Sequence, residues 1–199
     1  MRLVVAITGA SGVIYGVRFL EACREHDIST ELIVSEKAEI LLQEELGKSR
    51  GEVEALADVA YRPDDVRAPI ASGSQVRDGM VIVPCSMGTL GKIAGGIADN
   101  LIVRAADVYL KQRRPLVLVI RESPLSLVHL SNMERVACAG AVILPAAPAF
   151  YHKPSKISEL VDFVVGKIFD VLGVEHELYS RWGDQTSRAP VKRGEPYRV

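Results

Sequence analysis

Two charged residues stand directly after an aliphatic run. Residues 116–120 read Leu-Val-Leu-Val-Ile and are followed by Arg121 and Glu122. Such a run is typical of a strand inside a sheet, so the two charges are expected at its rim. There Arg121 can bind a phosphate, and Glu122, partly removed from water, can carry a proton. A salt bridge between them at the strand end is the alternative interpretation.

A glycine-rich turn, Gly-Ala-Ser-Gly at residues 9–12, follows the first aliphatic run. Glycine lets the backbone approach a phosphate at a helix start, and Ser11 can donate a further hydrogen bond. A tight strand-to-helix turn with Ser11 as N-cap is the alternative. A dinucleotide site requires an acidic residue at the end of the second strand. Ser35 stands there with Glu36 beside it, which argues against NAD without excluding it.

Small polar residues also open the segment after the third aliphatic run. These are Ser86, Met87, Gly88 and Thr89. They indicate either a second cradle for a phosphate or ring, or ordinary N-capping of a helix. Two cradles would suit a mononucleotide together with another anionic group.

A basic run at Lys111, Arg113 and Arg114 has two interpretations. It can complement the dipole at a helix C-terminus, or it can contact phosphate. Arg104 lies two turns earlier on the face of Lys111 and shares both interpretations.

Metal-assisted chemistry lacks the residues that it needs. Asp64 and Asp65 have Ala68 where a magnesium-binding prenyl-diphosphate motif would place a third Asp. The histidines and cysteines fit no metal spacing; they are His26, His129, His152, His176, Cys23, Cys85 and Cys138. We therefore expect no metal, and a leaving phosphate must be neutralised by Arg and Lys.

Aliphatic runs alternate with helical stretches along the chain. Strands are expected at 3–7, 31–34, 80–83, 116–120 and 141–144, and helices at 12–25, 36–46, 86–112 with a break near Asp99, 125–138 and 155–172. Residues 47–79 are expected to form a short helix and a surface loop. Continuous hydrophobicity means strands covered on both faces, so the sequence predicts a doubly wound α/β fold with a parallel sheet of about five strands. The carboxyl ends of these strands should bring the polar segments to one edge.

The bulk composition sets further limits. The 199 residues suit one domain, placed at 1–174, with a polar C-terminal tail at 175–199. A net charge of −1 offers no field for nucleic acid or an anionic membrane. Dispersed cysteines, no signal peptide and no membrane span make the cytoplasm the expected location.

Seven segments together resemble one known family. They are residues 6–12, 71–74, 84–90, 100–108, 111–116, 121–122 and 144–151. In order and spacing they are similar to the flavin prenyltransferases of ubiquinone biosynthesis and of the related phenylacrylic acid decarboxylase system, within the superfamily of flavin-containing Cys decarboxylases. The resemblance runs from residue 1 to about Trp182.

The resemblance implies a flavodoxin-like subunit that takes reduced FMN as its substrate. Dimethylallyl phosphate would be the prenyl donor, joined to N5 and then C6 of the flavin with release of phosphate. The resemblance also implies a homo-oligomer, a dodecamer with sites between subunits. The prenylated FMN would pass to a partner decarboxylase of the UbiD type.

The resemblance also assigns roles to individual residues. FMN would be held by Gly9, Ala10, Ser11, Ser35, Ser86, Met87, Gly88, Thr89 and Arg121. The donor would be held by Tyr151 and Lys167, with Arg104, Lys111, Glu45 and Trp182 also in the site. Catalysis would involve Glu122, Ser11 and Lys111. Some members carry Arg at the position of Lys167, and Lys keeps the charge but loses the bidentate fork.

Three rival functions differ in what they require. A flavin-dependent cysteine decarboxylase of the same fold uses a catalytic His near the loop that here reads Pro-Ile-Ala-Ser at 69–72, where no His stands. A non-catalytic FMN carrier needs no second phosphate site, which argues against it. A decarboxylase acting directly on aromatic acids would release carbon dioxide without a partner protein.

Overall fold

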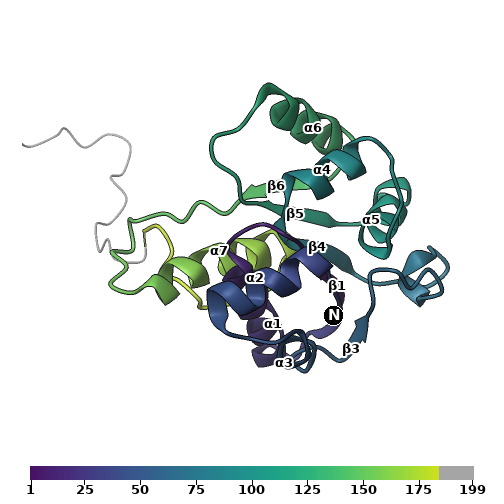
Figure 1. Ribbon diagram of the computed structural model, residues 1–199. Coiled ribbons are helices and arrows are strands. Elements are labelled where there is room, and N and C mark those ends of the chain that lie inside the picture. Colours follow the sequence, from purple (N-terminus) through teal and green to yellow (C-terminus); the bar gives the residue numbers. More distant parts are fainter. Residues whose placement is uncertain (184–199) are drawn as a thin grey trace, which may run out of the picture.

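Six parallel strands form the centre of the molecule (Figure 1). Their order is β3-β2-β1-β4-β5-β6, and every neighbouring pair is parallel. The bounds are β1 Arg2–Ile7, β2 Ser29–Val34, β3 Val59–Tyr61, β4 Gly79–Cys85, β5 Leu116–Ile120 and β6 Val142–Pro145. The chain reverses its direction across the sheet between β1 and β4, where ligands bind in open sheets of this kind.

Helices cover both faces of the sheet. Their bounds are α1 Val13–Glu25, α2 Glu36–Leu46, α3 Arg50–Glu54, α4 Met87–Ala94, α5 Leu101–Lys111, α6 Leu127–Cys138 and α7 Ile157–Leu172, with a 3₁₀ turn η1 at Pro69–Ala71. Helices α1, α2 and α7 pack into one hydrophobic core and α4, α5 and α6 into the other. The predicted doubly wound, flavodoxin-like fold is confirmed.

Alternation along β1 explains the two cores. Val5 and Ile7 point into the core of α1 and α7, whereas Val4 and Ala6 point into the core of α4 and α5. Successive side chains of a strand face opposite sides of the sheet, so a strand buried on both sides must be apolar throughout. The aliphatic runs of the sequence are unbroken because these strands are buried on both faces of the sheet.

The structure differs from the predicted elements in one strand. Residues 59–61 form the edge strand β3, which was expected to be loop, so the sheet has six strands in place of about five. Val59 and Ala60 are exposed and only β2 pairs with them, so no buried pattern marks this strand. The predicted break near Asp99 is confirmed, because the Asn100 side chain accepts from the Val103 amide and starts α5.

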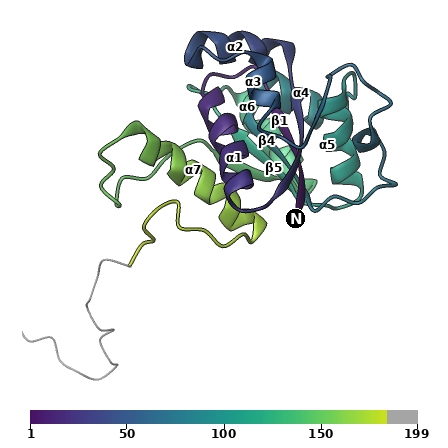
Figure 2. The same ribbon diagram turned by 90° about the horizontal axis from the view of Figure 1, so that it is seen from below.

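The structure, a computed structural model, describes residues 1–183. The predicted division into a domain at 1–174 and a tail at 175–199 stays a prediction, and residues 184–199 of that tail lie outside the described part. Residues 174–182, here called the return segment, run back beside α7 (Figure 2). Within the described residues, no helix is both long and apolar enough to cross a membrane.

Candidate active site

A buried threonine joins the loops that follow β1 and β4. The Thr8 hydroxyl donates to the Pro84 carbonyl at 2.7 Å and accepts from the Ser86 amide at 2.9 Å. Its side chain is buried, so neither partner can turn to water instead. Thr8 therefore fixes the glycine turn relative to the start of α4.

Replacing Thr8 by Val is expected to destabilise the protein by about 1–3 kcal/mol and to weaken FMN binding. Valine has nearly the same shape but leaves the Ser86 amide without its acceptor, and the Pro84 carbonyl then accepts only from the Thr8 amide. Urea unfolding and titration of the variant with FMN would measure both effects. Wild-type values in both experiments would contradict this role for Thr8.

The glycine turn is shaped by close packing and by one left-handed residue. A Cβ on Gly9 would lie 2.5 Å from the Cβ of Lys37, so a larger residue does not fit. Gly12 has a φ of 93° and precedes the first residue of α1. Ser11 does not cap the helix, so the alternative interpretation of this serine is wrong.

A carboxylate from α2 accepts hydrogen bonds from the first amides of α1. Glu45 accepts from the Gly12 amide at 2.9 Å and from the Val13 amide at 3.1 Å. These amides form the positive end of the helix dipole and attract an anion. The resemblance alone had suggested that Glu45 belongs to the site, and this contact places its carboxylate at the end of the glycine turn.

Arg121 reaches across to the same turn. Its Nε donates to the Ser11 carbonyl at 2.9 Å, and its Cγ would lie 3.7 Å from a Cβ on Gly12. Glu122 accepts from the Ser123 amide at 3.0 Å, and no ion pair joins it to Arg121 within residues 1–183. The strand-end salt bridge is therefore wrong, and both charges remain at the edge of the sheet.

Hydroxyl groups begin two more helices at this edge. The Ser35 hydroxyl accepts from the Ala38 amide at the start of α2. The Ser86 hydroxyl accepts from the Thr89 amide and lies 3.0 Å from the Thr89 hydroxyl at the start of α4. N-capping at Ser86 is confirmed. Among the described residues, the Met87 and Gly88 amides donate to no partner, so α4 still presents unpaired donors.

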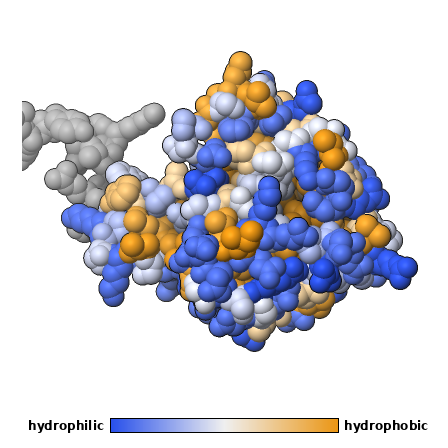
Figure 3. All heavy atoms as spheres, in the orientation of Figure 1, coloured by the Kyte–Doolittle hydropathy of each residue, from blue (hydrophilic) through white to orange (hydrophobic). Residues whose placement is uncertain are grey.

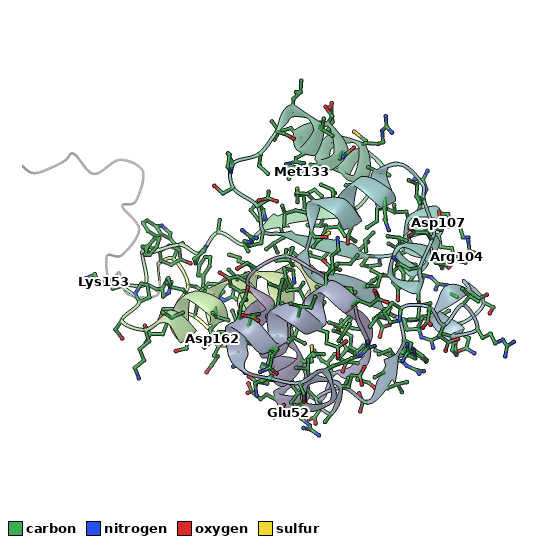
Figure 4. The ribbon with its side chains drawn as sticks, viewed as in Figure 1. Glu52, Arg104, Asp107, Met133, Lys153 and Asp162 are labelled. Atoms are coloured by element: carbon green, nitrogen blue, oxygen red, sulfur yellow. The ribbon has the colours of Figure 1, made fainter. Side chains whose placement is uncertain are left out.

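Arg104 and Lys111 lie on the face of the sheet that α4, α5 and α6 cover. Both belong to α5, where each pairs with Asp107 at 3.5 Å, and Arg104 also donates to the Ala71 carbonyl. Figure 4 shows Arg104 and Asp107 opposite the side that carries Lys153. Lys111 precedes β5 and Arg121 follows it, and β5 alone spans about 16 Å. One chain does not bring Lys111 to Ser11.

Tyr151, Lys167 and Trp182 gather in an aromatic cluster along α7. The Tyr151 ring lies 5.2 Å from the Trp182 ring and 5.9 Å from the Phe163 ring, edge to face. The Lys167 ammonium lies 5.7 Å from the Phe163 ring centre and 5.1 Å from that of Tyr179. The structure thus places the predicted FMN residues at the sheet edge, the predicted donor residue Lys167 on α7, and Tyr151 and Trp182 in the segments before and after this helix.

Asp170 holds Lys167 within this cluster. Its carboxylate lies 3.0 Å from the Lys167 ammonium and also accepts from the Tyr179 hydroxyl. Burial raises the pKa of Asp170, but the hydrogen bonds from Tyr179 and Lys167 outweigh it and hold that pKa below its usual range. The hydrogen bonds with the Tyr179 hydroxyl and the Asp170 carboxylate raise the pKa of Lys167. They outweigh partial burial, which alone would lower that pKa, so the ammonium stays charged.

No metal centre is found in the part of the chain that the structure describes. No three His, Cys, Asp or Glu side chains there gather as a metal would require. Metal independence stays a prediction.

Comparison with known proteins identifies the family. The family model described as Flavoprotein matches residues 1–169. A flavin prenyltransferase UbiX of Methanothermobacter thermautotrophicus is 50% identical over 180 residues, which are 90% of this chain and 94% of that protein. The chain belongs to the flavin prenyltransferase family.

Solved structures agree with this family assignment. The structure of AnUbiX (PadA1) in complex with FMN and dimethylallyl pyrophosphate has a TM-score of 0.90 and 47% identity, covering 91% of this chain and 96% of that one. A dodecameric FMN-dependent UbiX-like decarboxylase from Escherichia coli O157:H7 has a TM-score of 0.89 and 45% identity, covering 92% and 99%. The predicted resemblance to the flavin prenyltransferases is confirmed.

Proposed function

We propose that this member of the flavin prenyltransferase family transfers the dimethylallyl group of dimethylallyl phosphate to reduced FMN. One observation carries the proposal: the chain matches the FMN- and dimethylallyl-pyrophosphate-bound AnUbiX over 91% of its length at 47% identity. The two groups of residues described above supply what each substrate requires.

The edge of the sheet suits FMN. Its donors are the amides and hydroxyls of the glycine turn and of the α4 start, with the Arg121 guanidinium beside them. The first amides of α1 already donate to the Glu45 carboxylate. The FMN phosphate would therefore bind at the start of α4, where the amides of Met87 and Gly88 have no partner among the described residues. Ser11, Ser35 and Thr89 would orient the rest of the nucleotide.

The chain's own side chains prepare the transfer. The C1–O bond of the donor breaks as C1 joins flavin N5, which loses its proton, and phosphate leaves with the bonding electrons. The C2=C3 double bond of the transferred group then takes up a proton at C2, and C3 joins flavin C6, which loses a proton as the ring closes. Cationic Lys167 and Arg121, with the Tyr151 hydroxyl, would stabilise the departing phosphate. The aromatic rings of the α7 cluster would exclude water, and Glu122 would carry the proton.

We further propose a homododecamer whose sites lie between subunits. Lys111 lies near the amino ends of the strands and Ser11 near their carboxyl ends, so a second copy of the chain is needed to bring the two residues together. Apolar side chains at and just before the start of α6 and at the start of α7 are exposed, as Figure 3 shows over both regions; they are Leu125, Leu127, Val128, Leu130 and Ile157. Trp182 of the return segment is exposed as well. Faces of this kind favour contact between subunits.

The product is proposed to serve a decarboxylase of the UbiD type, in the cytoplasm. A modified flavin that is released unchanged from the enzyme that makes it requires a second protein that uses it as a cofactor. Release of carbon dioxide from an aromatic acid by the isolated chain would favour the direct decarboxylase instead.

An anaerobic incubation with reduced FMN and dimethylallyl phosphate tests the proposed function. Mass spectrometry of the extracted flavin is expected to show FMN heavier by one isoprenoid unit. Folded, FMN-loaded protein that leaves the flavin unmodified, with the diphosphate also inert, would overturn the proposal and favour the carrier or the decarboxylase.

Replacing Ser11 by Ala is expected to weaken FMN binding about 2- to 12-fold, the equivalent of one neutral hydrogen bond. Ser11 is exposed and its hydroxyl does not cap α1, so the hydroxyl is available to a ligand. Fluorescence titration with FMN measures the change. Ser131→Ala, an exposed serine on α6, is the control, and equal affinities for both variants would contradict the role of Ser11.

A further inference from the structure

The return segment is fastened to α7 at one carboxylate. Oδ2 of Asp170 accepts from Lys167 and Tyr179, and Oδ1 accepts from His176 at 3.1 Å and from Arg181 at 2.9 Å. Of these partners, His176, Tyr179 and Arg181 belong to the return segment. One side chain of α7 therefore holds the segment along its whole length.

The surface of α7 is shaped to receive this segment. A Cβ on Gly166 would lie 2.6 Å from the Tyr179 ring and 2.7 Å from His176 Cε1, so only glycine admits both. The His176 side chain is fully buried, and its Nδ1 accepts from the Leu178 amide. Its other nitrogen, Nε2, therefore carries the proton that is donated to Asp170.

The same carboxylate brings two cations together. Lys167 binds one oxygen and Arg181 the other, and both side chains are close to half exposed, whereas Asp170 is 23% exposed. A ligand arriving from solvent meets the two cations before it meets the carboxylate. Without Asp170 the two cations would repel each other, and each would lose the carboxylate that holds it beside the other.

We propose that Asp170 is a positioning residue of the prenyl-donor site, which holds Lys167 and Arg181 side by side for the donor phosphate. Arg181 is then the second cation of this subsite. The inference rests on the proposed function, because it takes dimethylallyl phosphate as the ligand. Through its contact with Arg181, Asp170 also fixes the position of the end of the return segment, where Trp182 packs on Tyr151.

Kinetics of two variants test the inference. Asp170→Asn replaces one accepting oxygen by an amide that cannot accept from its two donors, and Arg181→Gln removes the second cation without touching the buried contacts of His176. Each is expected to raise the KM for dimethylallyl phosphate about tenfold or more, the equivalent of one charge-assisted hydrogen bond, with the Kd for FMN unchanged. A purely structural role would lower the active fraction and leave this KM alone.

Asp162→Asn is the matched control. Asp162 lies on the same helix (Figure 4), is 25% exposed and pairs with Arg18 of α1 at 2.7 Å instead of with Lys167 or Arg181. Its donor KM is expected to equal that of the wild type. Trp182 is the only tryptophan of the chain, so its fluorescence anisotropy reports the return segment without turnover. The anisotropy should fall in Asp170→Asn and not in Asp162→Asn.

The outcomes separate this inference from the proposed function. Prenylated FMN from the wild type, with an unchanged donor KM in both Asp170→Asn and Arg181→Gln, would overturn the inference alone. An equal rise of KM in Asp162→Asn would also overturn it. No prenylated flavin from the wild type would overturn the proposed function and this inference with it.

Discussion

Glu122→Gln is expected to slow flavin prenylation about 10²- to 10⁴-fold while the affinity for FMN stays at its wild-type value. Glutamine keeps the size of the side chain and its contact with the Ser123 amide, but it cannot carry a proton. Glu122 is the second residue after β5 and is partly buried, so the sheet fixes its position beside Arg121. Anaerobic single-turnover rates, followed by mass spectrometry of the flavin, measure the effect.

The control for this variant is Glu134→Gln. Glu134 is an exposed carboxylate on α6 and should tolerate the same substitution without loss of rate. A turnover of Glu122→Gln equal to that of the control would remove Glu122 from proton transfer. The released phosphate would then be the better acceptor for the proton.

The sequence predicted the sheet because burial on both faces leaves a direct record. Runs such as residues 116–120 must be apolar at every position, and parallel strands bring their carboxyl ends to one edge. Strand β3 escaped prediction because two of its three residues are exposed. Its place depends on pairing with β2, which local composition does not encode.

The candidate site was predictable only in part. The glycine turn, the start of α4 and the Arg121–Glu122 pair follow aliphatic runs and could be found by their position. The contact of Glu45 with Gly12 joins residues 33 positions apart, and no pattern around Glu45 marks it. Asp170 looks like an ordinary helical carboxylate until the return segment folds back on it. Contacts that depend on tertiary packing leave no local signal.

Arg77→Met is expected to lower the free energy of unfolding by about 3 kcal/mol, near the lower end of the cost of breaking a buried ion pair. Arg77 donates to both oxygens of Glu31, at 2.6 and 3.1 Å, and the two side chains are 3% and 1% exposed. Methionine leaves the carboxylate to Arg2 and Tyr61 alone. Urea unfolding at a fixed protein concentration, followed by circular dichroism, measures the loss.

The double variant Glu31→Leu with Arg77→Met is the control for this prediction. It removes both buried charges, and apolar replacement of a buried ion pair is often close to neutral. Tyr61 and Arg2 are only partly buried, so in the double variant the Tyr61 hydroxyl and the Arg2 guanidinium can donate to water instead of to Glu31. The double variant is therefore expected to regain most of the stability that Arg77→Met loses. Equal losses in both would show that the arginine matters through its packing and not through its charge.

The pH dependence of the same variant provides an independent check. Burial raises the pKa of Glu31, but the hydrogen bonds from Arg77 and Tyr61 outweigh it and hold that pKa below its ordinary value of 4.5. The stabilisation is therefore complete above that value and is lost as the pH falls through the lowered pKa of the folded state. The stability difference between wild type and Arg77→Met should narrow on acidification below about pH 4.5. A difference that stays constant from pH 7 to the acid transition would contradict the ion pair as its source.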